Sequence, residues 1–329
     1  MSCLSRAIAR NPVLTLPRAT DSEGGIRRIG IELELGGLSA AAAAAVAQQT
    51  LGGEIDMVSR QEYRLEGSAI GTVKIYLDTA FRDHADSRAG QLGLDLARRV
   101  VPVELVTEPL TPQQLARCED LREALRDAGA IGSRNGPFLG FALHLNPALS
   151  GRTAADIVPV ACAFALLEDW LRGADPLDVT RRLLPFAHPY PRRFVDVLAA
   201  TFGIEELEPF WALYLQHNAT RNRGLDLLPI LTALDPERLT PLRDQLGKIT
   251  PRPAFHYRVP DSRVDERGWS IGYELGRWAV VERLAGMQPE LAALCLDWRD
   301  HRAALTTTPR NWRMHTEAFL RHHVMPGLA

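Results

Sequence analysis

The stretch Ile29-Gly-Ile-Glu-Leu-Glu-Leu35 decides the fold that this sequence predicts. Apolar and acidic residues alternate along it, and side chains of a β-strand point alternately to opposite faces, so it predicts a strand whose aliphatic residues face a core. Glu32 and Glu34 then lie side by side on the other face, where like charges repel each other. Either both carboxylates face water, as on a half-buried strand, or a cation lies between them. The rest of the chain is needed to choose between these two interpretations.

The composition is that of a folded globular protein with no strong overall charge. The chain has 329 residues, of which 46% are hydrophobic, which is enough for one large domain with a substantial core. Its 38 Lys and Arg residues nearly cancel its 40 Asp and Glu residues, leaving a net charge of -2. No overall field therefore attracts nucleic acid or an anionic membrane, and we expect neither as a partner.

The cysteines and the apolar segments indicate a cytoplasmic location. The four cysteines are far apart in the sequence and form no Cys-x-x-Cys pair, which argues against a zinc ribbon and a redox motif; they are Cys3, Cys118, Cys162 and Cys295. Reduced thiols in the cytoplasm are the simplest account. The first ten residues contain no long apolar run, and no window of about twenty apolar residues occurs, so secretion and membrane spanning are not expected.

The chain predicts a mixture of strands and helices after an irregular lead-in over residues 1–25. A helix over residues 40–51 begins after Ser39 as N-cap and ends at Gly52. Short strands at 54–58, 63–66 and 72–77 follow as an antiparallel meander. Helices are predicted at 85–100, 111–128, 153–172, 194–202, 206–218, 269–285, 288–304 and 311–324. With no internal repeat and no obvious linker, residues 26–329 predict one domain, with a sheet core over about 26–260 and a helical part over 261–329.

Three further predicted strands carry polar residues within apolar sequence. Glu104 interrupts the apolar run at residues 101–107, so it points into a polar cavity or lies on an edge strand. His144 and Asn146 share one face of the run at residues 138–146. His256 and Arg258 share one face of the run at residues 252–260. Taken singly, a strand histidine is most simply a hydrogen-bonded core or edge residue.

These strands would form a binding pocket if they are neighbours in a curved antiparallel sheet. The concave face would then be acidic and rimmed by arginine. Clustered carboxylates suit oxygen-preferring cations such as Mg²⁺ or Mn²⁺, which bridge substrate phosphates. Arginine suits phosphate and carboxylate groups. Two more arginines, Arg221 and Arg223, are expected in a loop, and Asp78 closes the run at residues 74–78, where an Asp is most often a turn former.

The order of these motifs resembles the amidoligase family, a branch of the carboxylate-amine ligases related to glutamine synthetase. The matching segments are Arg28-Ile-Gly-Ile-Glu-Leu-Glu34, Asp78-Thr-Ala80, Glu104-Leu-Val-Thr-Glu-Pro-Leu110, Leu143-His-Leu-Asn146, residues 218–223 and Phe255-His-Tyr-Arg258. The resemblance implies an α+β fold with a curved, mainly antiparallel, glutamine-synthetase-like sheet, helices packed on its outer face and a helical C-terminal region. It also implies ATP, magnesium or manganese, and amide formation through an acyl phosphate, with small-molecule or peptide carboxylates and amines as substrates.

The resemblance also implies roles for individual residues. The metal ligands would be Glu32, Glu34 and Glu104. The residues near the nucleotide would be His144, Asn146, His256 and Asp78. The residues that stabilise charge during phosphoryl transfer to the carboxylate would be Arg258, Arg221 and Arg223.

Two departures from the family pattern leave other functions open. His256 stands where the family commonly has a glutamate, and Asn146 stands where a second histidine is frequent. Losing a carboxylate lowers the negative charge of the pocket and weakens its hold on metal. The alternatives are a phosphotransferase or metal-dependent amide hydrolase using the same pocket, and a non-catalytic nucleotide- or peptide-binding relative. The common nucleotide-loop, metalloprotease and serine-hydrolase motifs are absent from the sequence.

Overall fold

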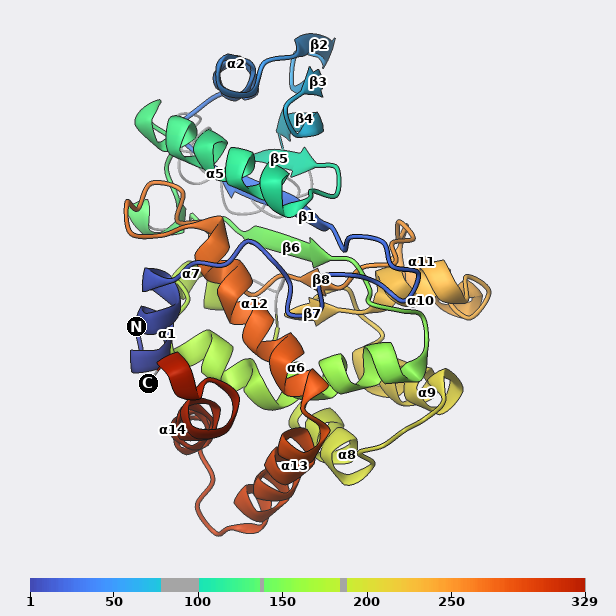
Figure 1. Ribbon diagram of the computed structural model, residues 1–329. Coiled ribbons are helices and arrows are strands. Elements are labelled where there is room, and N and C mark those ends of the chain that lie inside the picture. The colour runs from blue at the N-terminus through green and yellow to red at the C-terminus, as the bar shows by residue number, and fades with distance from the viewer. Residues whose placement is uncertain (78–100, 137–138, 184–187, 329) are drawn as a thin grey trace.

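The computed structural model describes residues 1–77, 101–136, 139–183 and 188–328. Over these residues the fold is α+β, with an eight-stranded, open antiparallel sheet in the order β2-β3-β4-β5-β1-β6-β8-β7 (Figure 1). The strands are β1 Ile29–Leu35, β2 Glu54–Ser59, β3 Glu62–Ser68, β4 Gly71–Leu77, β5 Val103–Thr107, β6 Leu143–Pro147, β7 Leu225–Asp226 and β8 His256–Tyr257. The predicted helix at residues 85–100 and Asp78 lie outside the described residues.

Strand β1 lies near the centre of the sheet, between β5 and β6. Its aliphatic residues are buried in the core, Leu35 completely. Both neighbours run antiparallel to it: Glu32 is opposite Val106 of β5 and His144 of β6, and Glu34 is opposite Glu104 of β5. The period-two pattern therefore separates an apolar face from a polar one, as predicted.

Helices cover the apolar face in two groups. Over the meander of β2, β3 and β4 lies α2 (Ala40–Leu51), and α5 (Pro112–Asp127) packs on α2 and lies beside β5 in Figure 1. Both begin as the sequence predicts: the Ser39 side chain accepts a hydrogen bond from the backbone N–H of Ala42, and Thr111 forms a capping box with Gln114.

The second group of helices covers the other end of the sheet. Here α6 (Ala154–Gly173) and α12 (Ile271–Gly286) pack on each other. The Trp278 ring of α12 lies 5.2 Å from the ring of Tyr257, on the face of β8 opposite His256. Around these helices lie α8 (Arg192–Ala200), α9 (Leu207–Asn218), α13 (Gln288–Ala303) and α14 (Pro309–Phe319), with a π-helical turn at Leu320–Val324. No helix of the described part of the chain is long and apolar enough to cross a membrane.

A buried ion pair fixes the start of β1 to α12. The Arg27 guanidinium donates to both carboxylate oxygens of Glu282, at 2.8 and 2.7 Å, and also to the carbonyl oxygens of Ala148 and Arg18. Glu282 accepts a third hydrogen bond from the indole N–H of Trp278. The side chains of Arg27 and Glu282 are only 2% and 6% exposed, so each charge depends on the other.

The structure corrects three local predictions. The lead-in expected to be irregular contains α1 (Cys3–Arg10), which Ser2 caps and which packs on α12. The strands expected over residues 138–146 and 252–260 are shorter: β6 begins at Leu143, and β8 has only two residues. Pro253 and Pro260 have no N–H to donate, so the ladder of β8 cannot extend through them. The short helices α7 (Val179–Leu183), α10 (Leu228–Leu234) and α11 (Arg243–Leu246) were not predicted, since none is long enough to show a helical period.

Candidate active site

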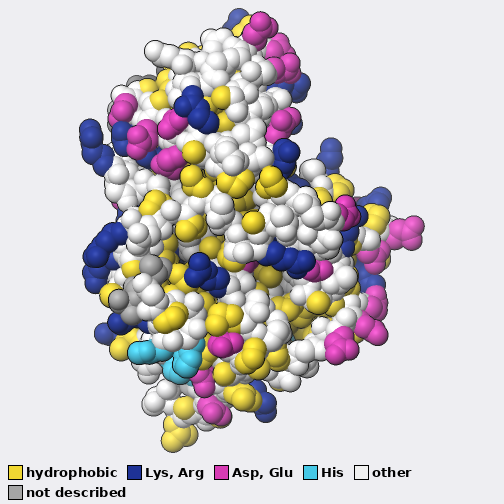
Figure 2. Space-filling model, viewed as in Figure 1, with side chains coloured by type: hydrophobic (Ala, Val, Ile, Leu, Met, Phe, Trp, Pro, Cys, Tyr) yellow, Lys and Arg dark blue, Asp and Glu magenta, His cyan; other side chains and the backbone are white. Residues whose placement is uncertain are grey.

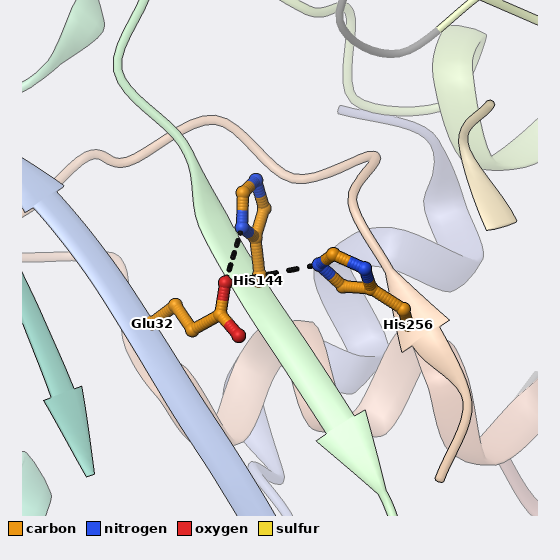
Figure 3. A group of neighbouring side chains, drawn as sticks. All are labelled: Glu32, His144 and His256. Atoms are coloured by element: carbon orange, nitrogen blue, oxygen red, sulfur yellow. Dashed lines mark hydrogen bonds and ion pairs between the residues drawn. The ribbon is translucent and has the colours of Figure 1, made fainter. Parts of the chain in front are cut away.

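Ionisable side chains from four adjacent strands meet on the polar face of the sheet. They are Glu32 of β1, His144 of β6, His256 of β8 and Asp226 of β7, and all four are buried. Pairing of Glu32 with His144, and of Asp226 with His256, brings them into one row. Figure 3 shows Glu32 and His144 reaching toward each other from neighbouring strands, with a ring nitrogen of His256 directed at them from the next strand.

Each carboxylate oxygen of Glu32 has its own partners. Oε2 is 3.0 Å from Nδ1 of His144. Oε1 accepts hydrogen bonds from the Asn146 amide at 3.0 Å and from Nη1 of Arg252 at 2.6 Å. The same Arg252 nitrogen donates to Oδ1 of Asn146 at 3.0 Å. Glu32 is therefore held in one orientation, with Oε2 facing the histidines.

The protonation states in this cluster follow from burial and hydrogen bonding. Burial alone would raise the pKa of Glu32, but its interactions with His144 and His256 outweigh burial and hold that pKa well below its usual value. Burial lowers the pKa of His144 to about 3, although Glu32 acts in the opposite direction. A neutral His144 beside an ionised Glu32 donates its Nδ1–H to the carboxylate, which leaves the lone pair on Nε2.

His256 is the least satisfied member of the cluster. Its Nε2 lies 3.7 Å from Oε2 of Glu32 and its Nδ1 lies 3.8 Å from Oδ2 of Asp226, both beyond hydrogen-bond distance. Both ring nitrogens and this oxygen of Asp226 are buried without a hydrogen-bond partner among the described residues. Buried polar atoms of this kind are rare in folded proteins and need an explanation.

The three carboxylates predicted as metal ligands share the polar face of the sheet. Glu34 and Glu104 lie opposite each other on β1 and β5, and Oε2 of Glu34 also accepts the backbone N–H of Ala142 at 2.8 Å. Among the described residues, however, the donors near enough to share one ion come from Glu32, His144 and His256, within 4.8 Å of one another. The metal roles of Glu34 and Glu104 remain a prediction.

Two of the three predicted arginines border this cluster. The charge of Arg258 interacts with Asp226, Glu32 and Glu34, while burial lowers the pKa of Arg258. Its Nη1 donates to the Arg221 carbonyl at 2.5 Å, and Nε of Arg221 lies 3.8 Å from Asp226.

The third predicted arginine, Arg223, contacts backbone. It donates to the carbonyls of Pro189 at 3.1 Å and His217 at 3.2 Å, which ties the loop to neighbouring segments. The catalytic roles of all three arginines remain predictions.

The sequence reasoning missed Arg252, Asp226 and Arg181. Arg252 is four residues before His256, so the period of two could have placed both on one face. Asp226 interrupts an apolar run between Leu225 and Leu227, the signal that identified Glu104. No sequence signal pointed to Arg181 of α7, which donates to the carbonyl of Arg258 at 2.6 Å and so fixes that strand end.

The chain matches one protein-family model. It is described as "Putative amidoligase enzyme" and matches residues 25–280, which run from just before β1 into α12 and include every residue of the cluster. Comparison with curated proteins and comparison with solved structures found no match.

Proposed function

Because the chain belongs to the amidoligase family over residues 25–280, we propose that it is an ATP- and magnesium-dependent carboxylate-amine ligase. It would join a small-molecule or peptide carboxylate to an amine through an acyl phosphate, on a sheet related to that of glutamine synthetase. The observation that carries this proposal is the buried, ionised Glu32 with histidines on one side and Arg252 on the other. Such a cluster offers both cation ligands and anion partners, which phosphoryl transfer to a carboxylate needs.

The three predicted carboxylates are the reason to propose magnesium or manganese. Glu32, Glu34 and Glu104 share one face of β1 and β5, and carboxylate oxygens are the donors that Mg²⁺ prefers. Glu32, Glu34 and Glu104 would hold the ion, which would supply neutralisation of phosphate charge. His144, Asn146, His256 and Asp78 are the candidates for the nucleotide side of the pocket.

The arginines would bind the reacting anions. Arg258 and Arg221 lie beside the acidic cluster, where their guanidinium groups can pair with the substrate carboxylate or the transferred phosphoryl group. Arg252 keeps 38% of its side chain exposed while it holds Glu32, so an incoming anion can reach it. In the reaction, the carboxylate oxygen bonds to the γ-phosphorus and ADP leaves. The amine nitrogen then bonds to the acyl carbon, phosphate leaves and the nitrogen loses a proton.

Hydroxylamine trapping tests this reaction without knowledge of the natural amine. The purified chain is incubated with ATP, Mg²⁺, hydroxylamine and a panel of amino acids, peptides and dicarboxylates. An acyl phosphate reacts with hydroxylamine to give a hydroxamate, which forms a coloured complex with ferric iron. A ligase should give matching amounts of ADP and hydroxamate that depend on one of the acids.

A matched pair of variants tests whether the predicted metal site is used. Glu34→Gln keeps an oxygen that can accept the Ala142 N–H but removes the charge, so it should abolish Mg²⁺-dependent binding of a fluorescent ATP analogue. Glu66→Gln removes an exposed carboxylate of β3 and should leave that binding unchanged. Equal ATP affinity in wild type and Glu34→Gln, with Mg²⁺ present, would exclude Glu34 from the site.

The hydroxylamine and ATP-binding assays together also distinguish the alternative functions. The histidine-rich donors around Glu32 are a specific reason to consider a metal-dependent amide hydrolase, because imidazole and carboxylate ligands commonly hold ions that activate water. Cleavage of an amide without ATP would support that enzyme. Phosphate transfer to a substrate without hydroxamate would support a phosphotransferase, and tight ATP binding without turnover would support a binding protein.

A further inference from the structure

The polar face of the sheet contains a second group of possible metal ligands, beside the carboxylates of Glu34 and Glu104. Glu32, His144 and His256 provide one carboxylate and two imidazoles, each from a different strand and each buried (Figure 3). His256 is the unusual member, because its side chain is only 7% exposed and neither ring nitrogen has a hydrogen-bond partner among the described residues. A ligand for one of these nitrogens would remove the cost of burying it.

Two of the three separations among the donor atoms are close to those around a single ion, and all three atoms lie within 4.8 Å of one another. Ligand atoms bonded at ~2.0–2.1 Å to one tetrahedral ion lie ~3.3 Å apart. From Oε2 of Glu32, Nδ1 of His144 is at 3.0 Å and Nε2 of His256 is at 3.7 Å, so the two observed separations bracket that value. Metal binding through Nδ1 requires the proton of neutral His144 to move to Nε2, which leaves its charge unchanged.

Neighbouring residues leave one oxygen of Glu32 for this ion. Asn146 and Arg252 both bind Oε1, so only Oε2 faces the imidazoles. Three protein donors also leave coordination positions open, which is the arrangement of catalytic rather than structural sites. A substrate oxygen or water can take those positions.

Two nitrogens among three donors decide the kind of ion. Mg²⁺ prefers oxygen ligands in octahedral geometry, whereas imidazole suits Zn²⁺ and similar transition ions. We propose that Glu32, His144 and His256 form a site for an imidazole-binding divalent ion of the Zn²⁺ and Co²⁺ type, and that this site prefers such an ion to Mg²⁺. It occupies the pocket of the proposed ligase, but its existence does not depend on ligase activity.

Cobalt titration of the full-length chain tests the site without ATP or substrate. Chelator-treated protein is titrated with CoCl₂ in excess Mg²⁺, and the visible ligand-field absorption is recorded. One equivalent of Co²⁺ should produce the bands, and Zn²⁺ but not more Mg²⁺ should remove them. Absence of the bands, or their loss to Mg²⁺, would overturn the proposal.

Variants show whether the absorbing ion is in the cluster. His256→Gln and His144→Gln should each weaken Co²⁺ binding by about a hundredfold, since loss of even an outer partner costs ~10–100-fold in metal affinity. Glu66→Gln removes an exposed carboxylate of β3, far from the donors, and should keep the Co²⁺ affinity. His256→Glu replaces a nitrogen donor with oxygen donors and should reduce the preference for Co²⁺ over Mg²⁺. Circular dichroism and thermal unfolding establish that each variant is folded.

A surface patch could bind the same probe and needs its own control. Histidines gather on one part of the surface in Figure 2, in a groove lined by His315, His322 and His323, where His315 lies 2.8 Å from Asp297. All titrations are therefore repeated with His315→Gln and His322→Gln combined. The ligand-field bands should persist in that variant, and their disappearance would assign the ion to the surface and refute the buried site. Failure of hydroxamate formation with intact Co²⁺ binding would reject the ligase and leave the metal site.

Discussion

Removing Arg27 should leave the buried Glu282 carboxylate without its cationic partner and so destabilise the protein. In Arg27→Met the Glu282 carboxylate, now 6% exposed, would lose two hydrogen bonds from the guanidinium and keep only the one from Trp278. Breaking a buried ion pair by removing one partner costs about 3–5 kcal/mol. Folded domains are stable by only about 5–15 kcal/mol, so this loss is large. Urea unfolding followed by circular dichroism should show a lower midpoint with an unchanged slope.

A double variant separates the stranded charge from lost packing. Arg27→Met with Glu282→Leu removes both charges, so the cost of the unpaired carboxylate disappears while the carbonyls of Ala148 and Arg18 still lack their donor. The double variant should recover about 2 kcal/mol relative to the sum of the single variants, within the range of coupling between residues in contact. Strictly additive losses would refute the view that charge burial, rather than packing or carbonyl contacts, makes this pair important.

Two other predictions concern stability. Burial raises the pKa of Asp261 to about 6, against the effects of Arg181 and the Asp178 N–H. Since the folded pKa is above the unfolded one, protonation of Asp261 stabilises the fold below about pH 4 and this stabilisation is lost as pH rises through 6, by at most about 3 kcal/mol. Between pH 4 and 7 the wild type should lose unfolding free energy relative to Asp261→Asn, whose amide does not ionise. A difference in unfolding free energy that stays constant over this range would contradict the raised pKa. Gly52→Ala should cost about 1–3 kcal/mol, because its φ of +70° and ψ of -165° suit glycine alone. Gly53→Ala should cost more, because a Cβ there would also collide with the Glu66 carbonyl, and equal unfolding temperatures for the two variants would argue against that collision.

Local sequence was sufficient to predict which side chains share a face of a strand, because that depends only on the period of two. The alternation around Glu32 separated the polar from the apolar face, and the same reasoning placed His144 and His256 correctly on the polar faces of their strands. The caps of α2 and α5 were also confirmed, because a capping residue acts within one turn. The family resemblance drawn from the order of the motifs is confirmed by the family match over residues 25–280.

Contacts between distant segments were beyond local sequence. Nothing near Glu32 predicts that β6 will be its neighbour on one side, or that Arg252, 220 residues later, will bind its carboxylate. The grouping of Glu32 with two histidines, rather than with the other carboxylates, depends on that strand order. Asp226 lies on a two-residue strand, too short for a periodic pattern to appear.

The strand order has a consequence for how the protein is made. The ribosome delivers β1 early, and β2, β3 and β4 can pair with one another as they emerge. Folding slows when contacts join residues far apart in the chain, and the partners of Glu32 arrive 112 and 220 residues after it. A nascent chain that ends before Arg252 therefore has Glu32 without the guanidinium that pairs with it, and this buried cluster is among the last parts of the molecule to assemble.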